Sequence, residues 1–234
     1  MPDEPAIAAQ DLHSASRSPR GRWLVAGVVV VAMAATGFVV SRNGRSSSAA
    51  DTGEAPRFVD DTGLSGVDHS YDGEYEFFVG GGVAAFDCNG DGFDDLYLAG
   101  GAAPAALYRN ESEVAGALRF ERLTSPVTDL TAVTGAYPID VDSDGLTDLA
   151  VLRRGANAVL RGVGDCRFED ATGDLGLDAG DEWTTAFSAT WEGTNALPTL
   201  AFGNYRTIDD DACADNSVVR PSPAGAGYDG PIAL

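Results

Sequence analysis

Lysine is absent from the chain, and basic residues of any kind are few. The 15 basic residues are all arginine, and 36 aspartates and glutamates give a formal net charge of −21. Such a charge excludes general nucleic-acid binding through a basic patch. Histidine occurs only twice and cysteine three times, with no Cys-x-x-Cys or Cys/His spacing of the kind that indicates zinc. The sequence also has no nucleophile elbow and no phosphate-binding glycine loop. We therefore predict that the protein is not an enzyme.

Aspartate, in contrast, is abundant and occurs in a repeated pattern. Two segments, residues 87–95 and 140–148, read Asp-x-(Asp/Asn)-x-Asp-Gly-x-x-Asp, and a leucine follows each. We call them the first and the second acidic loop. Side-chain oxygens at alternate positions, with a glycine where the chain turns sharply, are typical of a loop around Ca²⁺, which takes roughly six to eight oxygen ligands. The alternative is a solvated turn rich in Asp and Gly.

Each acidic loop supplies side chains and one backbone carbonyl as predicted calcium ligands. The carboxylates repel one another when no cation is bound, so calcium is expected to stabilise the fold. We therefore predict two structural Ca²⁺ sites. The predicted ligands are Asp87, Asn89, Asp91, the carbonyl of Phe93 and Asp95 in the first loop, and Asp140, Asp142, Asp144, the carbonyl of Leu146 and Asp148 in the second.

An EF-hand loop opens with a similar pattern but differs in two respects. It needs a glutamate at its twelfth position and a helix on either side, whereas that position here holds Leu98 and Val151. The segments around the acidic loops are short, apolar and bounded by Gly or Pro, which is typical of buried strands. They are residues 83–86 and 96–98 around the first loop, and residues 137–139 and 149–152 around the second. We reject the EF-hand and predict the order strand, calcium loop, strand.

The N-terminal region contains an apolar run at residues 23–40 with arginines on both sides. Its length is at the short end for spanning a bilayer, and its flanks favour an N-terminus inside the cell. We predict a retained transmembrane anchor, with residues 1–22 as a cytoplasmic tail and residues 41–56 as a flexible linker. A cleaved signal peptide, with cleavage near residues 32–34, is the competing interpretation. Both place the rest of the chain outside the cytoplasm, either anchored to the membrane or secreted.

The cysteines are an odd number for an exported protein, so at least one has no partner within the chain. They are Cys88, Cys166 and Cys213. Cys88 falls inside the first acidic loop, at a position that supplies no ligand. The sequence leaves the pairing of the three open.

The acidic loops are parts of a longer repeat. Leu-Tyr-Arg-Asn and Phe-Glu-Arg-Leu-Thr follow the first loop, and Val-Leu-Arg-Gly and Phe-Glu-Asp-Ala-Thr follow the second. One unit therefore has four short strands in about 50 residues, which indicates a blade of a β-propeller. We predict a third unit at residues 183–191 and 198–205, whose connecting segment lacks the carboxylates and hence the metal. The alternative is that this segment is no repeat.

These motifs resemble the FG-GAP/VCBS repeat family, whose members include the propellers of the integrin-α type. The match covers residues 57–228, and residues 80–87 with the later Gly-Asn-Tyr at 203–205 look like the ASPIC/UnbV or cartilage-acidic-protein-like subgroup. The resemblance implies an extracellular, calcium-binding propeller without catalysis. Residues 57–234 hold only about three blades, whereas a propeller closes a ring of about four to eight. We therefore expect a partial propeller, either the N-terminal part of a longer protein or a truncated reading frame. The other alternative is a chain that closes the ring by oligomerising.

Two hypotheses for the function follow. The first is an exported, calcium-stabilised propeller module for cell adhesion or ligand binding, whose partner is an extracellular protein or a polysaccharide. The alternative is the propeller part of a carbohydrate-active enzyme, a hydrolase or lyase whose catalytic region is missing or unrecognised. We favour the first, because the paired carboxylates of the acidic loops are better suited to bind calcium than to act as an acid and a base.

Overall fold

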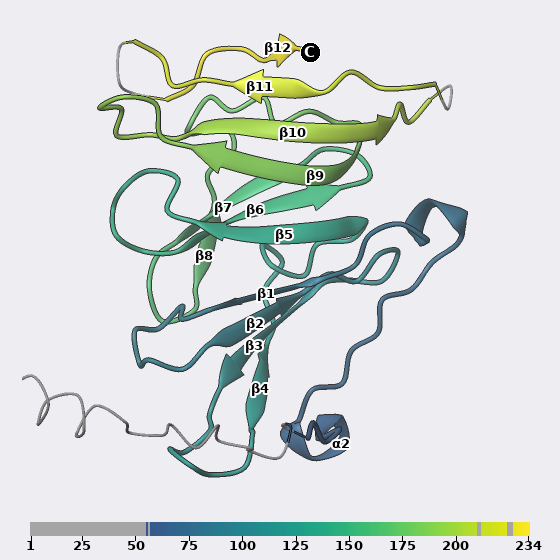
Figure 1. The fold of residues 1–234 in the computed structure, drawn as a ribbon, viewed down its shortest axis with the longest axis vertical. Coiled ribbons are helices and arrows are strands. Elements are labelled where there is room, and N and C mark those ends of the chain that lie inside the picture. The colour runs from purple at the N-terminus through teal and green to yellow at the C-terminus, as the bar shows by residue number, and fades with distance from the viewer. Residues whose placement is uncertain (1–54, 56, 210–211, 224–226) are drawn as a thin grey trace, which may run out of the picture. The chain divides into compact units, whose positions relative to one another are not determined.

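The computed structural model describes residues 55, 57–209, 212–223 and 227–234. The chain divides into two units, residues 1–58 and Val59–Leu234, and only the second is described in any length (Figure 1). The predicted cytoplasmic tail and apolar run, and nearly all of the predicted linker, lie outside the described residues. Within the described part, no helix has both the length and the apolar character needed to cross a membrane.

Residues 59–234 form three antiparallel sheets, each of four strands. In all three sheets the strands lie in chain order, so each strand pairs with the strands that come before and after it in the sequence. The first sheet contains β1 (Val83–Phe86), β2 (Asp95–Leu98), β3 (Ala106–Asn110) and β4 (Phe120–Leu123). The second contains β5 (Val133–Ile139), β6 (Asp148–Arg153), β7 (Ala158–Gly162) and β8 (Phe168–Asp170). The third contains β9 (Trp183–Thr190), β10 (Thr199–Arg206), β11 (Ser217–Val219) and β12 (Ile232–Ala233).

The structure confirms the all-β class and the four-stranded unit. The predicted third unit is a four-stranded antiparallel sheet of the same kind. Helix is confined to two short turns among the described residues, α2 (Thr62–Ser65) and a 3₁₀ turn, η1 (Tyr75–Phe77).

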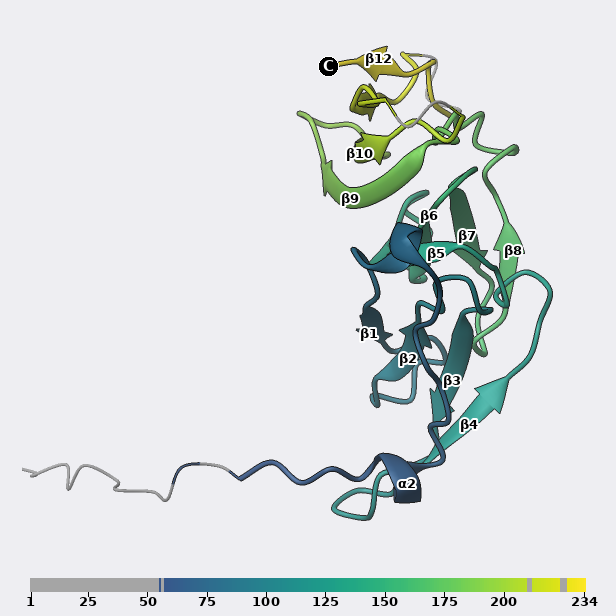
Figure 2. The same cartoon turned by 90° about the vertical axis from the view of Figure 1, so that its right-hand side faces the viewer.

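The sheets pack face to face in chain order through two apolar cores, as the successive sheets in Figure 2 illustrate. Strand β6 contributes to both cores, because successive side chains of a strand point to opposite faces. Leu149 and Val151 pack toward the first sheet, and Leu152 packs toward the third. The second sheet is therefore covered on both faces, which explains why residues 149–152 form an uninterrupted apolar run.

The acidic loops occupy equivalent places in this arrangement. The first joins β1 to β2, and the second joins β5 to β6. In each, the last aspartate of the motif is the first residue of the second strand, where it pairs with the last residue of the strand before: Asp95 with Phe86, and Asp148 with Ile139. The strand ends thus fix both ends of each loop.

Candidate functional site

The sharp turn within each acidic loop is made by a glycine in the left-handed region. Gly92 has φ = 86° and Gly145 has φ = 87°. A Cβ atom at either position would have no atom within 4 Å. The requirement is therefore conformational rather than steric, since non-glycine residues rarely adopt this backbone geometry.

The second acidic loop brings three of its predicted ligands together. One carboxylate oxygen from each of Asp140, Asp142 and Asp148 lies within 4.8 Å of the others. Two oxygens on opposite sides of one Ca²⁺ are roughly 5 Å apart, because each Ca–O distance is about 2.3–2.6 Å. The three carboxylates are therefore close enough to bind a single ion. Asp144 lies outside this group, and its Oδ1 accepts a hydrogen bond from the backbone amide of Leu146 (2.8 Å).

Asp148 is fully buried at the start of β6. Its Oδ2 accepts from the backbone amide of Val141 and its Oδ1 from that of Gly162, both at 2.8 Å. Burial raises the pKa of Asp148 to about 6, and the negative charges of Asp142 and Asp144 act in the same direction. The two amides oppose this shift without cancelling it. A buried carboxylate among other carboxylates is stabilised in its charged form by a cation.

Asp142 supplies the observation that tests whether the donor set fits calcium. Its Oδ2 accepts from Nε of Arg161 at 2.6 Å. Its Oδ1 is buried and has no hydrogen-bond partner. An unpartnered buried oxygen destabilises a fold by roughly 1–3 kcal/mol, and Asp142 is one of the three clustered carboxylates. The residues of the second loop therefore fit a hard, oxygen-binding cation.

The first acidic loop is held by many internal hydrogen bonds. The backbone amides of Gly90 and Gly92 donate to the carboxylate of Asp87 at 2.7 and 2.8 Å. These amides lower the pKa of Asp87, with that of Gly92 having the largest effect. The side-chain amide of Asn89 donates to Oδ2 of Asp91 (2.9 Å). The loop is thus folded around its acidic side chains.

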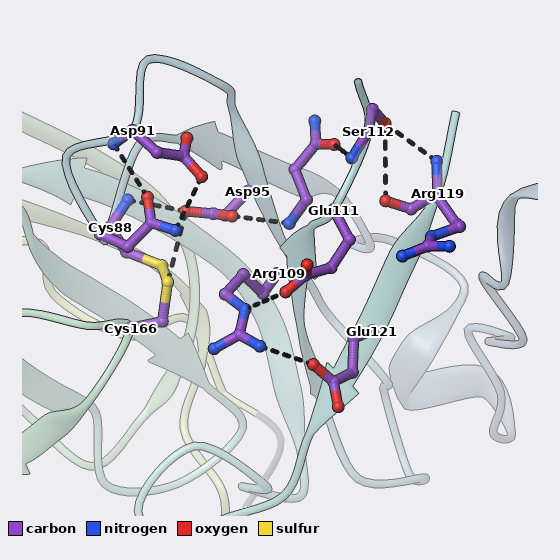
Figure 3. Close-up of polar contacts among 11 residues, drawn as sticks. Cys88, Asp91, Asp95, Arg109, Glu111, Ser112, Arg119, Glu121 and Cys166 are labelled. Carbon is purple, nitrogen blue, oxygen red and sulfur yellow. Dashed lines mark hydrogen bonds and ion pairs between the residues drawn. A yellow bond between two sulfur atoms is a disulfide. The ribbon is translucent and has the colours of Figure 1, made fainter. Parts of the chain in front are cut away.

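Asp95 occupies the place in the first loop that Asp148 occupies in the second. It is fully buried, and its Oδ2 accepts from the backbone amide of Cys88 and its Oδ1 from that of Asn110, both at 2.8 Å (Figure 3). Burial raises its pKa, with smaller contributions from Asp91 and Asp87. In the part of the chain that the structure describes, the carboxylates of this loop do not form a group of three within 4.8 Å; Asp95 groups instead with Cys88 and Cys166.

Cys88 and Cys166 form a disulfide across a sequence separation of 78 residues, and Cys213 is free and exposed. The bond joins the first acidic loop to the turn between β7 and β8 of the second sheet (Figure 3). Sequence reasoning missed this pair, because three cysteines allow three pairings and no spacing selects one. The odd number of cysteines is nevertheless explained by one pair and one free thiol.

The loop between β9 and β10, residues 191–198, is closed without an aspartate cluster. Glu192 is its acidic residue, and its Oε1 accepts from Oγ1 of Thr199 (3.0 Å) and Nε of Arg220 (3.1 Å). Thr199 is the first residue of β10, the place where the other two sheets have a buried aspartate. An arginine from this chain therefore balances the charge of the third loop.

The fold and the two acidic loops define an all-β repeat protein in which a strand, an acidic loop and a strand recur. Residues 87–151 match the family model described as FG-GAP-like repeat. This match, which begins at the first aspartate of the first loop and ends within β6, supports an FG-GAP repeat protein, as the motifs predicted. No curated protein matches the chain.

Proposed function

We propose that the chain is an exported repeat module of the β-propeller type, stabilised by calcium, that binds an extracellular protein or polysaccharide and is not catalytic. The observation that carries the calcium part is the cluster of Asp140, Asp142 and Asp148, together with the buried, unpartnered Oδ1 of Asp142. The FG-GAP-like repeat and the stacked four-stranded sheets support the propeller part. Each sheet is one blade in this proposal.

The two loops act as structural calcium sites. Extracellular calcium modules have dissociation constants of about 10⁻⁴–10⁻³ M, so such sites stay largely occupied outside the cell. Bound calcium neutralises the carboxylates that the fold gathers, and it stabilises the native state because the unfolded chain does not hold these ligands together. Export is supported by the apolar run of residues 23–40 and its flanking arginines.

Thermal unfolding of the full chain with Ca²⁺ and with a chelator tests the proposal. At a calcium concentration about 100 times the dissociation constant, one site adds roughly 2.7 kcal/mol, which raises the melting temperature of a domain of this size by roughly 5–10 °C. The variant Asp140→Ala/Asp142→Ala is expected to lose the share of this rise that belongs to the second loop. Asp94→Ala is the matched control, since Asp94 is exposed within the first loop and is not a predicted ligand. A melting temperature indifferent to calcium would refute the metal sites.

A further inference from the structure

The first acidic loop is attached to the neighbouring sheet by a covalent bond. Cys88 stands between two predicted ligands, Asp87 and Asn89, and its sulfur is bonded to Cys166 of the second sheet. The backbone amide of Cys166 also donates to the carbonyl of Cys88 (3.1 Å). The loop segment that holds the first three ligands is therefore fixed to a different sheet from the one that supplies Asp95.

Both half-cystines also contact Asp95, the buried predicted ligand of the first loop. The backbone amide of Cys88 donates to Oδ2 of Asp95 (2.8 Å), and Sγ of Cys166 lies 3.3 Å from the same oxygen. A disulfide sulfur carries no proton, so the second contact is packing and not a hydrogen bond. Together the two contacts define where the carboxylate of Asp95 lies relative to the rest of the loop.

The second acidic loop is also attached to a neighbouring sheet, but by apolar packing instead of a covalent bond. Val141 stands at the position of Cys88, and its backbone amide donates to Oδ2 of Asp148 (2.8 Å). Its side chain is buried in the core between the second and third sheets. Each loop is thus fastened to the next sheet through its second residue, by a disulfide in one case and by apolar packing in the other.

We propose that the Cys88–Cys166 disulfide is the positioning element of the first calcium site, so that calcium binding at this loop depends on the redox state of the pair and binding at the second loop does not. The inference rests on the proposed calcium function. Reduction by a dithiol transfers two electrons and two protons: the dithiol closes to its own disulfide, and Cys88 and Cys166 each gain an S–H bond. The freed loop must then be ordered at the moment of binding, which weakens affinity.

Each half-cystine lines a crevice. Cys166 lines a crevice of about 470 Å³ between the outer strands of the first and second sheets. Cys88 lines a smaller one of about 170 Å³ between the two acidic loops. The coupling is also reciprocal by thermodynamic necessity. If oxidation tightens calcium binding tenfold, saturating calcium makes the disulfide harder to reduce by about 30 mV.

Calorimetric Ca²⁺ titration of the full chain tests the inference, with Cys213→Ser as the background to remove the free thiol. Asp140→Ala/Asp142→Ala leaves only the first site, and Asp87→Ala/Asp91→Ala leaves only the second. Each variant is titrated oxidised and after reduction with dithiothreitol. We expect reduction to raise the dissociation constant of the first site about tenfold or more and that of the second by less than about twofold. Cys88→Ser/Cys166→Ser, which removes the bond without supplying the apolar anchor of the second loop, is expected to weaken the first site without any reductant.

The outcomes separate this inference from the function on which it rests. If neither oxidised variant binds calcium, the calcium function fails and the inference with it. If the second site binds and the oxidised first site does not, the first calcium site of the proposed function fails and the inference with it. If the oxidised first site binds and reduction leaves its affinity unchanged, the inference alone is overturned. An equal loss at both sites also overturns it, because it reports general loosening of the fold. If the disulfide were merely structural, its reduction would lower the melting temperature of the calcium-free protein and leave the calcium affinity of the first site as it was.

Discussion

Asp95 and Asp148 begin the second strand of their sheets and are fully buried. In both residues the two carboxylate oxygens accept backbone amides, one from the loop that precedes the strand and one from the end of the next strand. The carboxylate therefore ties three segments together before any cation is present. The same residue is a predicted calcium ligand, so at this position structure and binding depend on one side chain.

Calcium binding at the second loop is expected to depend on pH through Asp148. Its pKa is raised from 3.8 to about 6, so the folded calcium-free protein holds this proton more tightly than the unfolded chain does. Its contribution to stability is full below about pH 4 and is lost as the pH rises through about 6. Calcium needs the ionised form, so affinity should rise over the same window.

The variant Asp87→Ala/Asp91→Ala isolates the second site for this measurement. With a pKa of about 6, roughly a tenth of Asp148 is ionised at pH 5 and roughly nine tenths at pH 7. Calorimetric titration is therefore expected to show binding about tenfold weaker at pH 5. An affinity that is constant between these pH values would mean that the proton on Asp148 does not compete with calcium.

At the scale of elements, the sequence predicted the strands best where they adjoin the acidic loops. The ends of β1 and β5 and the starts of β2 and β6 follow from apolar segments that meet an aspartate motif, because the motif marks where the sheet stops. The third sheet was predicted from apolar segments alone and was confirmed. What could not be predicted depends on contacts between distant segments: the disulfide between Cys88 and Cys166, and the clustering of one set of carboxylates but not the other.

The third loop provides an element-scale test of calcium dependence. Arg220 and Glu192 are both partly exposed, and exposed ion pairs contribute little to stability because water and salt screen them. Arg220→Gln is therefore expected to lower the melting temperature by at most a few degrees. The decrease should be the same with calcium and with a chelator, as scanning calorimetry would measure. A decrease that calcium reverses would indicate a metal site in the third loop, contrary to the prediction from its sequence.

At the scale of the whole described unit, the second sheet contributes side chains to both apolar cores. Leu149 and Leu152 of β6 are both fully buried, but they belong to different cores, one shared with the first sheet and one with the third. Loss of either side chain leaves a cavity between two sheets. Truncation of a buried leucine to alanine typically destabilises a protein by about 2–5 kcal/mol.

If the three sheets unfold as one cooperative unit, Leu149→Ala and Leu152→Ala should each lower the free energy of unfolding by about 2–5 kcal/mol in a single transition. Leu118→Ala is the control, because that side chain is half exposed, and surface substitutions usually change stability by less than about 0.5 kcal/mol. Urea unfolding followed by tryptophan fluorescence and by circular dichroism makes the comparison. Trp183 and Trp191 lie at the start of β9 and just after its end, so in a Trp23→Phe background fluorescence reports on the third sheet while circular dichroism reports on all three. Midpoints that separate in Leu152→Ala but coincide in Leu149→Ala would show that the third sheet unfolds on its own. The third sheet would then be coupled to the other two only through the core that Leu152 fills.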